Sequence, residues 1–171
     1  AAAREAPRST IATGPTTPDL LPSNLVLNGT GINFSLNNGG AAAAAASTTG
    51  VYLSADSTIT AADTLLTTVS TPSLAAGASD NESVSVTLPT NLTPGTYYLG
   101  VLADYNAQVA ESSEGNNGSN GVPIILGNNS INTLNGTASN DTFFAFAGND
   151  TVVGGGGSDT MTGGGGNDTF V

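Results

Sequence analysis

The chain has 171 residues, with 13 Asp and Glu, two Arg, and neither Lys nor His, so its formal net charge is −11. No cationic side chain follows Arg8. Because phosphate contacts need Lys or Arg, this composition argues against nucleic acid and against an anionic membrane surface as partners. The absence of His and Cys removes the common nucleophile systems and the usual zinc ligands, so we predict no catalytic residues.

Residues 1–18 are rich in Ala, Pro, Thr and Gly, which indicates a disordered tail or an interdomain linker. The alternative is the last element of a preceding domain. The sequence begins without Met or a signal-peptide core, so we expect a fragment or a processed product. No apolar run is long enough to span a membrane.

Residues 19–126 contain short apolar segments between turn signals, which predicts about seven strands. In the segment 82–89, Val84, Val86 and Leu88 alternate with polar residues, as in a strand with one buried face. Seven strands in this length favour a two-sheet sandwich. Residues 41–46, six alanines, are too few to nucleate a helix and are predicted as an extended or edge segment. The predicted core consists of Leu25, Val51, Leu53, Leu65, Val84, Val86, Tyr97, Leu99, Val101 and Ile125.

Three stretches in this region resemble the CARDB family, the cell-adhesion-related domain of bacteria. They are "PDLLPSNLVL", "NNGGAAAAAASTTGVYLSAD" and "LPTNLTPGTYYLGVLADYNAQVAESSEGNN". The resemblance covers residues 19–126. It implies an immunoglobulin-like β-sandwich, an extracellular setting and no enzymatic activity.

After a predicted connector at 127–135, residues 136–171 divide into four nonamers: "GTASNDTFF", "AFAGNDTVV", "GGGGSDTMT" and "GGGGNDTFV". Position six is always Asp, position seven is always Thr, and position eight is apolar. The pattern resembles the calcium-binding nonapeptide repeat of RTX proteins, which implies a parallel β-roll. The predicted fold class is therefore all-β, an immunoglobulin-like sandwich followed by a short calcium-binding β-roll. The position-eight residues are Phe143, Val152, Met161 and Phe170.

The repeat also predicts where its carboxylates lie. Three residues such as 160–162 form a short strand whose middle side chain points inward, and the Gly-rich remainder forms a turn. Two nonamers complete one coil, so Asp141 stacks on Asp159 and Asp150 stacks on Asp168. Ca²⁺ prefers six to eight oxygen ligands, which these carboxylates and the turn carbonyls would supply. The predicted metal-binding residues are Asp141, Asp150, Asp159, Asp168, Gly154, Gly156, Gly157, Gly163, Gly165 and Gly166.

Gly-rich repeats with few inward apolar groups are costly to order, so we expect metal binding and folding to be one event. The resemblance to RTX proteins implies type I secretion, with the repeats unfolded inside the cell and folded by calcium outside. Ser139, Ala145 and Phe146 replace glycines of the pattern, which weakens the prediction for the first two turns. A plain Gly-rich linker is the alternative, but it does not explain the periodic Asp.

Other acidic and aromatic residues form weaker patterns. Asp56 and Asp63 fit turn caps better than a second calcium site, and Asp104, Glu111 and Glu114 fit a solvated rim. Tyr97, Tyr98 and Tyr105 fit core or sheet positions better than a binding surface. The leading interpretation is a non-catalytic adhesion or spacer region of a secreted bacterial protein, extracellular or at the cell surface, with calcium ions and an extracellular ligand as partners. The alternatives are the accessory region of an exported hydrolase such as a protease, or a carbohydrate-binding module.

Overall fold

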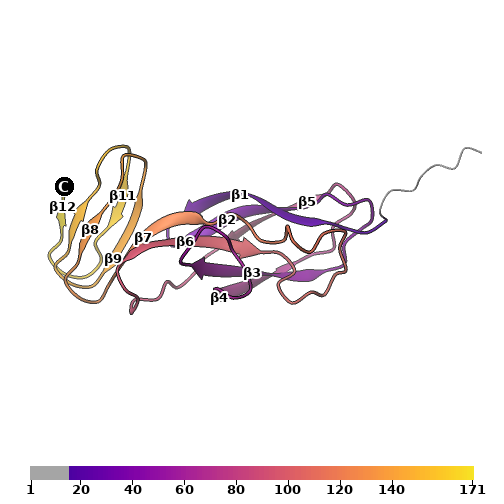
Figure 1. Ribbon diagram of the computed structural model, residues 1–171, viewed down its shortest axis with the longest axis horizontal. Helices are drawn as coiled ribbons and strands as arrows, with labels where there is room; N and C mark the ends of the chain where they lie inside the picture. The colour runs from indigo at the N-terminus through magenta and orange to yellow at the C-terminus, as the bar shows by residue number, and fades with distance from the viewer. Residues whose placement is uncertain (1–15) are drawn as a thin grey trace, which may run out of the picture.

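The computed structural model describes residues 16–171, which form twelve strands and no helix (Figure 1). The tail predicted at 1–18 lies almost entirely outside the described residues. The strands are β1 (Leu20–Asn28), β2 (Gly31–Asn38), β3 (Ser47–Ser54), β4 (Thr64–Thr71), β5 (Ser79–Val84), β6 (Gly95–Leu102), β7 (Val122–Asn128), β8 (Thr133–Asn135), β9 (Thr142–Phe146), β10 (Thr151–Val153), β11 (Thr160–Thr162) and β12 (Thr169–Phe170).

The sandwich consists of two sheets that pack over one core. Strands β1, β2 and β5 form an antiparallel sheet, and β4, β3, β6 and β7 form four strands of a six-stranded sheet. Alternate residues of each strand point into the core, as the period of two requires. Fully buried members from the first sheet include Leu20, Ile32 and Leu36, and those from the second include Val51 and Leu99.

Most of the predicted core is confirmed, with one error and one reassignment. Leu65 is 43% exposed, because the β3–β4 pairing shifts register between Val51 and Tyr52 and turns the neighbouring Leu66 toward the core. Ile125 is buried, but in a separate core at the C-terminal end. Val51, Leu53, Val86, Leu99 and Val101 are buried in the sandwich core, and Leu25, Val84 and Tyr97 pack against it partly buried.

The strand predictions for the sandwich are also confirmed in outline. Val86 and Leu88 are buried and Val84 is half-buried, as the alternation predicts, although β5 begins at Ser79 and ends at Val84. The alanine run contains no helix. It bends at residues 41–42 and forms an isolated antiparallel bridge between Ala44 and Leu74, so the prediction of no helix is correct but the run is not a continuous strand.

The C-terminal strands form the predicted parallel β-roll. One sheet contains β8, β10 and β12, and the other contains β7, β9 and β11. Thr142 pairs with Thr160 and Thr151 pairs with Thr169, so each repeat stacks on the repeat two later. The coils enclose a small second core made of Ile125, Leu134, Phe143, Ala145 and Val152, with Met161 packed against it.

Phe170 lies opposite the buried Val152 in the parallel β10–β12 pairing, so it is on the same face, but it is much less buried. It is 50% exposed, because β12 is the last strand and no further coil of the described chain covers it. In Figure 1 the roll occupies one end of an elongated molecule, and the start of β1 lies toward the other end. The two parts share a sheet, because β7 pairs with β6 of the sandwich and with β9 of the roll.

Candidate metal centre

The turns of the third and fourth repeats are built on glycines in the left-handed region. Gly155 and Gly164, at position two, have φ of 88° and 94°, and Gly157 and Gly166, at position four, have φ of 103° and 129°. A Cβ on Gly155 would overlap the carbonyl of Thr137 in the coil above it. Position two therefore needs glycine for the turns to stack, a steric role separate from the predicted metal ligands at positions one, three and four.

The second repeat keeps this turn shape without the glycine. Phe146 takes position two and adopts a positive φ of 74°, which bulky residues rarely do. Its side chain packs against the sandwich core. The packing offsets the backbone strain, so this substitution alters the sequence pattern more than the turn.

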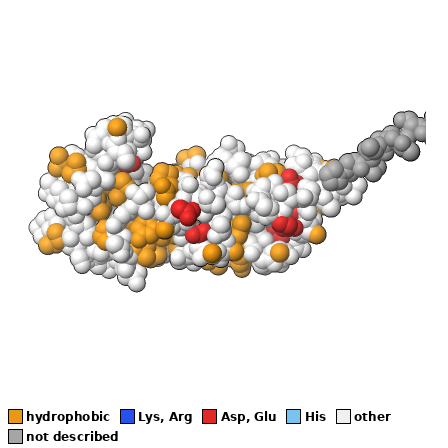
Figure 2. Space-filling view, in the orientation of Figure 1, with side chains coloured by type: hydrophobic (Ala, Val, Ile, Leu, Met, Phe, Trp, Pro, Cys, Tyr) orange, Lys and Arg blue, Asp and Glu red, His pale blue; other side chains and the backbone are white. Residues whose placement is uncertain are grey.

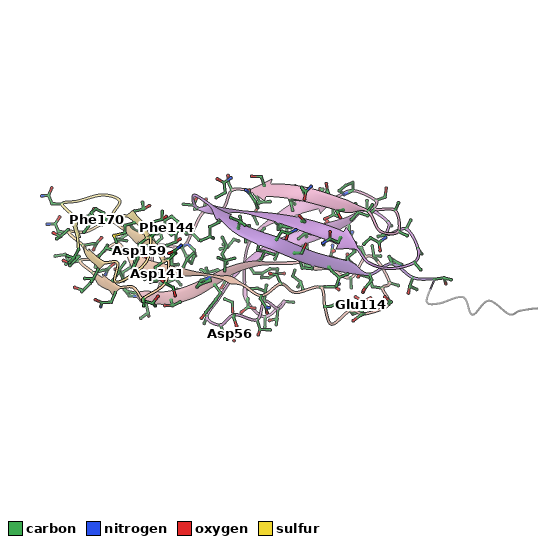
Figure 3. The ribbon with its side chains drawn as sticks, turned by 90° about the horizontal axis from the view of Figure 1, so that it is seen from above. Asp56, Glu114, Asp141, Phe144, Asp159 and Phe170 are labelled. Atoms are coloured by element: carbon green, nitrogen blue, oxygen red, sulfur yellow. The ribbon has the colours of Figure 1, made fainter. Side chains whose placement is uncertain are left out.

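The predicted stacking of the repeat aspartates is present, and Figure 3 labels one pair, Asp141 and Asp159. The Asp159 carboxylate accepts a hydrogen bond from the Asp141 amide at 2.9 Å, and the Asp168 carboxylate accepts one from the Asp150 amide at 3.0 Å. Each carboxylate thus meets the backbone of the coil before it. The contact orients one oxygen and leaves the other for a different partner.

Asp150 carries the clearest indication that a cation fits the roll. Its side chain is 1% exposed, and Oδ1 accepts the Asn132 amide at 2.7 Å. Oδ2 is buried without a hydrogen-bond partner among residues 16–171. A buried carboxylate oxygen without a partner is costly, and a bound cation would compensate it. The residues present therefore fit calcium.

Carboxylates alone do not complete such a site. No group of three or more Asp, Glu, His or Cys is placed to hold a metal within the described part of the chain. Calcium sites in proteins combine carboxylates with backbone carbonyls. The remaining ligands would therefore be carbonyls of the glycine turns.

A fifth nonamer precedes the four that the sequence pattern predicted. Residues 127–135, "GNNSINTLN", place Asn132 at position six, Thr133 at position seven and Leu134 at position eight. The Asn132 amide donates to Asp150 just as the Asp141 amide donates to Asp159. The signal was the Asn-Thr-Leu triplet nine residues before Asp-Thr-Phe, and a neutral position six concealed it.

In the acidic loop after β6, carboxylates accept hydrogen bonds from backbone amides. Asp104 is 4% exposed and accepts the amides of Gln108 and Val109, so the predicted solvated rim is wrong for this residue. Glu111 accepts the Leu20 amide at the start of β1. Burial raises the pKa of Glu111, the Leu20 hydrogen bond opposes the shift, and the nearby charges of Glu114 and Asp104 add to it.

The remaining weak patterns are largely local structure. Asp56 accepts the Thr58 amide and Asp63 accepts the Thr60 amide, so both cap turns as predicted. Tyr97 and Tyr98 are neighbours on β6 and line different hollows, one beside Asp63 and the other beside Asp141. The tyrosines therefore do not form a single binding surface.

Strand β5 carries a pair of carboxylates, Asp80 and Glu82, that the sequence patterns did not predict. Asp80 and Glu82 lie two apart on the half-buried face of the strand, and Asp80 Oδ2 has no hydrogen-bond partner in the described residues. Burial raises the pKa of Glu82, and hydrogen bonding to and repulsion from Asp80 raise it further. The folded chain therefore binds a proton at pH values where the unfolded chain has lost it.

This pair makes sandwich stability depend on pH. The pKa of Glu82 is raised in the folded chain. Its contribution to the free energy of unfolding is therefore complete below the ordinary pKa and is lost as pH rises through the folded pKa. Lowering the pH from about 7 toward about 5 in chelator is expected to raise the urea midpoint. Glu82→Gln should reduce the slope of the urea midpoint against pH. A slope as steep as that of the wild type in Glu82→Gln would contradict this assignment.

Comparisons with known proteins agree with this architecture. The CARDB family profile matches residues 18–121, and the profile of the RTX calcium-binding nonapeptide repeat matches residues 126–161 and 145–171. The RTX match at residues 126–161 begins before Gly136 and includes the nonamer that contains Asn132. RTX nonapeptide repeats bind calcium and are typical of secreted proteins, and neither family is catalytic. No helix long and apolar enough to cross a membrane occurs in residues 16–171.

Two solved structures resemble the sandwich. One is the CARDB domain of a Pyrococcus furiosus protein in complex with di-metal ions, with 17% identity, a TM-score of 0.44, and coverage of 64% of this chain and 88% of that chain. The other is β-glucosidase 3B from Thermotoga neapolitana in complex with α-D-glucose, with 15% identity, a TM-score of 0.43, and coverage of 63% and 16%. No curated protein matches. The profile matches show that the chain belongs to the CARDB family and carries RTX calcium-binding nonapeptide repeats after that domain.

Proposed function

We propose that this chain is an extracellular adhesion or spacer module whose C-terminal roll folds around calcium after export. The observation that carries the proposal is the buried Asp150 carboxylate, whose Oδ2 has no partner among residues 16–171. Calcium would supply the missing positive charge, since no Lys, Arg or His occurs after Arg8.

The ligands would come from two stacked turn pairs. The carboxylates would come from two stacked pairs, Asp141 with Asp159 and Asp150 with Asp168. The carbonyls would come from the turns that contain Gly154, Gly156, Gly157, Gly163, Gly165 and Gly166. Calcium bound there neutralises charge and cross-links neighbouring coils. The turns orient its ligands, and the stacked amides fix one oxygen of Asp159 and one of Asp168.

The roll lacks the apolar content to fold without this metal. Its separate core has five buried side chains, one of them Ala145, and Met161 is only half-buried. Glycine-rich turns lose more conformational entropy on folding than other residues would. Residues 136–171 that stay unfolded at low calcium would suit export by a type I route, and the higher calcium outside would then fold them.

Calcium titration of the full chain tests the proposal. Far-ultraviolet circular dichroism in chelator should show the sandwich alone, and millimolar calcium should add β signal while magnesium does not. Hydrogen exchange should place the new protection in residues 136–171. Protection of this segment that is identical with chelator and with calcium would contradict the proposed function.

A further inference from the structure

Strand β9 contributes side chains to two different cores. Phe143 and Ala145 point into the core of the roll, and both are completely buried. Phe144, 6% exposed, belongs to the sandwich core, and Phe146 packs against that same core. The first strand of the calcium repeats is therefore also a strand of the sandwich.

The hydrogen-bonded sheet has the same continuity. β7 pairs antiparallel with β6 and parallel with β9, where Leu126 lies opposite Phe144. Leu126 is buried in the sandwich core, while its neighbour Ile125 is buried in the roll core. Figure 1 shows β9 continuing the sheet beside β7, and Figure 2 shows hydrophobic side chains gathered where the roll meets the sandwich.

The coil before β9 is held by neutral groups. Asn132 Oδ1 accepts the Asn128 amide at 2.7 Å, Asn128 donates to the Leu92 carbonyl, and Asn129 donates to the Thr90 hydroxyl. No acidic side chain takes part in these contacts. Residues 128–129 are therefore tied to the sandwich without calcium, whereas β8 pairs with β10 and Leu134 is buried in the core of the roll.

We propose that calcium completes the sandwich core, because Phe144 and Phe146 enter it only when residues 136–171 fold around the metal. This inference rests on the proposed calcium-dependent folding. Linkage then requires that whatever stabilises the roll also stabilises the sandwich. With calcium bound, the sandwich and the roll form one folded unit. At low calcium β9 leaves β7, so the part of the sandwich core beside Leu126 is exposed to solvent.

Hydrogen exchange of the full chain tests the coupling at a distance from the metal. β3 lies in the sandwich and has no residue in the roll, so its amides report global opening of the sandwich. In the wild type, calcium should slow exchange in Ser47–Ser54 by about tenfold or more, as expected when a large aromatic side chain joins a core. Phe144→Ala should reduce that calcium-dependent slowing to the part that Phe146 contributes. In chelator it should exchange like the wild type, because the side chain is then outside the core.

Val153→Ala is the matched control, because Val153 occupies position nine of the second repeat as Phe144 occupies it in the first, but lies outside the sandwich core. It should keep the calcium response of β3. Wild-type β3 exchange that is independent of calcium, while residues 160–162 become protected, would overturn the inference alone. The inference would also be overturned if Phe144→Ala speeded amide exchange in β3 equally in chelator and in calcium. Absence of calcium-induced protection anywhere in 136–171 would instead overturn the proposed function.

Discussion

Phe143→Ala is expected to leave residues 136–171 unfolded at calcium concentrations that fold the wild type. Phe143 is 0% exposed and is the largest side chain in the core of the roll. Truncating a buried Phe to Ala costs about 3–5 kcal/mol. A roll of short repeats has little stability to lose, since whole domains have only about 5–15 kcal/mol. Hydrogen exchange at Thr160–Thr162 in millimolar calcium measures the loss.

Phe170→Ala provides the matched comparison. Phe170 holds position eight of the last repeat but is 50% exposed, so its truncation should cost less than about 1 kcal/mol. The calcium midpoint should then stay close to that of the wild type. Equal losses in the two variants would mean that the coils do not depend on a buried inner core.

The nine-residue period was enough to predict the register of the roll. A strand of three residues and a turn of six leave one way to close a coil from two nonamers, and Thr142 does lie opposite Thr160. The period placed Phe170 on the same face as Val152, but it did not predict that Phe170 is 50% exposed, since the period does not say how well each position is covered. The repeat pattern with Asp at position six does not include Asn132, which is neutral.

The sandwich shows a similar limit. Alternation predicted the core positions of β3 and β6, but it assigned Leu65 to the core. The register shift beside Tyr52 changes which side chain faces inward, and it arises from pairing between distant segments. Local pattern does not contain that information.

The double role of β9 was partly visible in the sequence. Residues 142–146, "TFFAF", have four apolar residues in succession, which indicates a strand buried on both faces. A β-roll has only one inner face, so the second apolar face required another partner. Only the tertiary structure shows that this partner is the sandwich core, reached through Phe144 and Phe146.

Asp150→Asn is expected to raise the calcium concentration at the folding midpoint by about tenfold or more, since removing a ligand charge weakens calcium sites. Asn preserves the size of the side chain and an Oδ1 acceptor for the Asn132 amide. What it removes is the negative charge and the oxygen that lacks a partner among residues 16–171. A titration followed by circular dichroism, with isothermal calorimetry for the bound metal, measures the shift.

The same substitution should act in the opposite direction when calcium is absent. A carboxylate that is 1% exposed and only half satisfied opposes folding, and a neutral amide removes that cost. Residues 136–171 of Asp150→Asn should therefore be no less protected in chelator than those of the wild type. Asp56→Asn removes one carboxylate from an exposed turn of the sandwich and should leave the calcium midpoint unchanged. A midpoint that moves equally in both variants would attribute the effect to net charge, whereas a shift confined to Asp150 identifies its carboxylate as a calcium ligand.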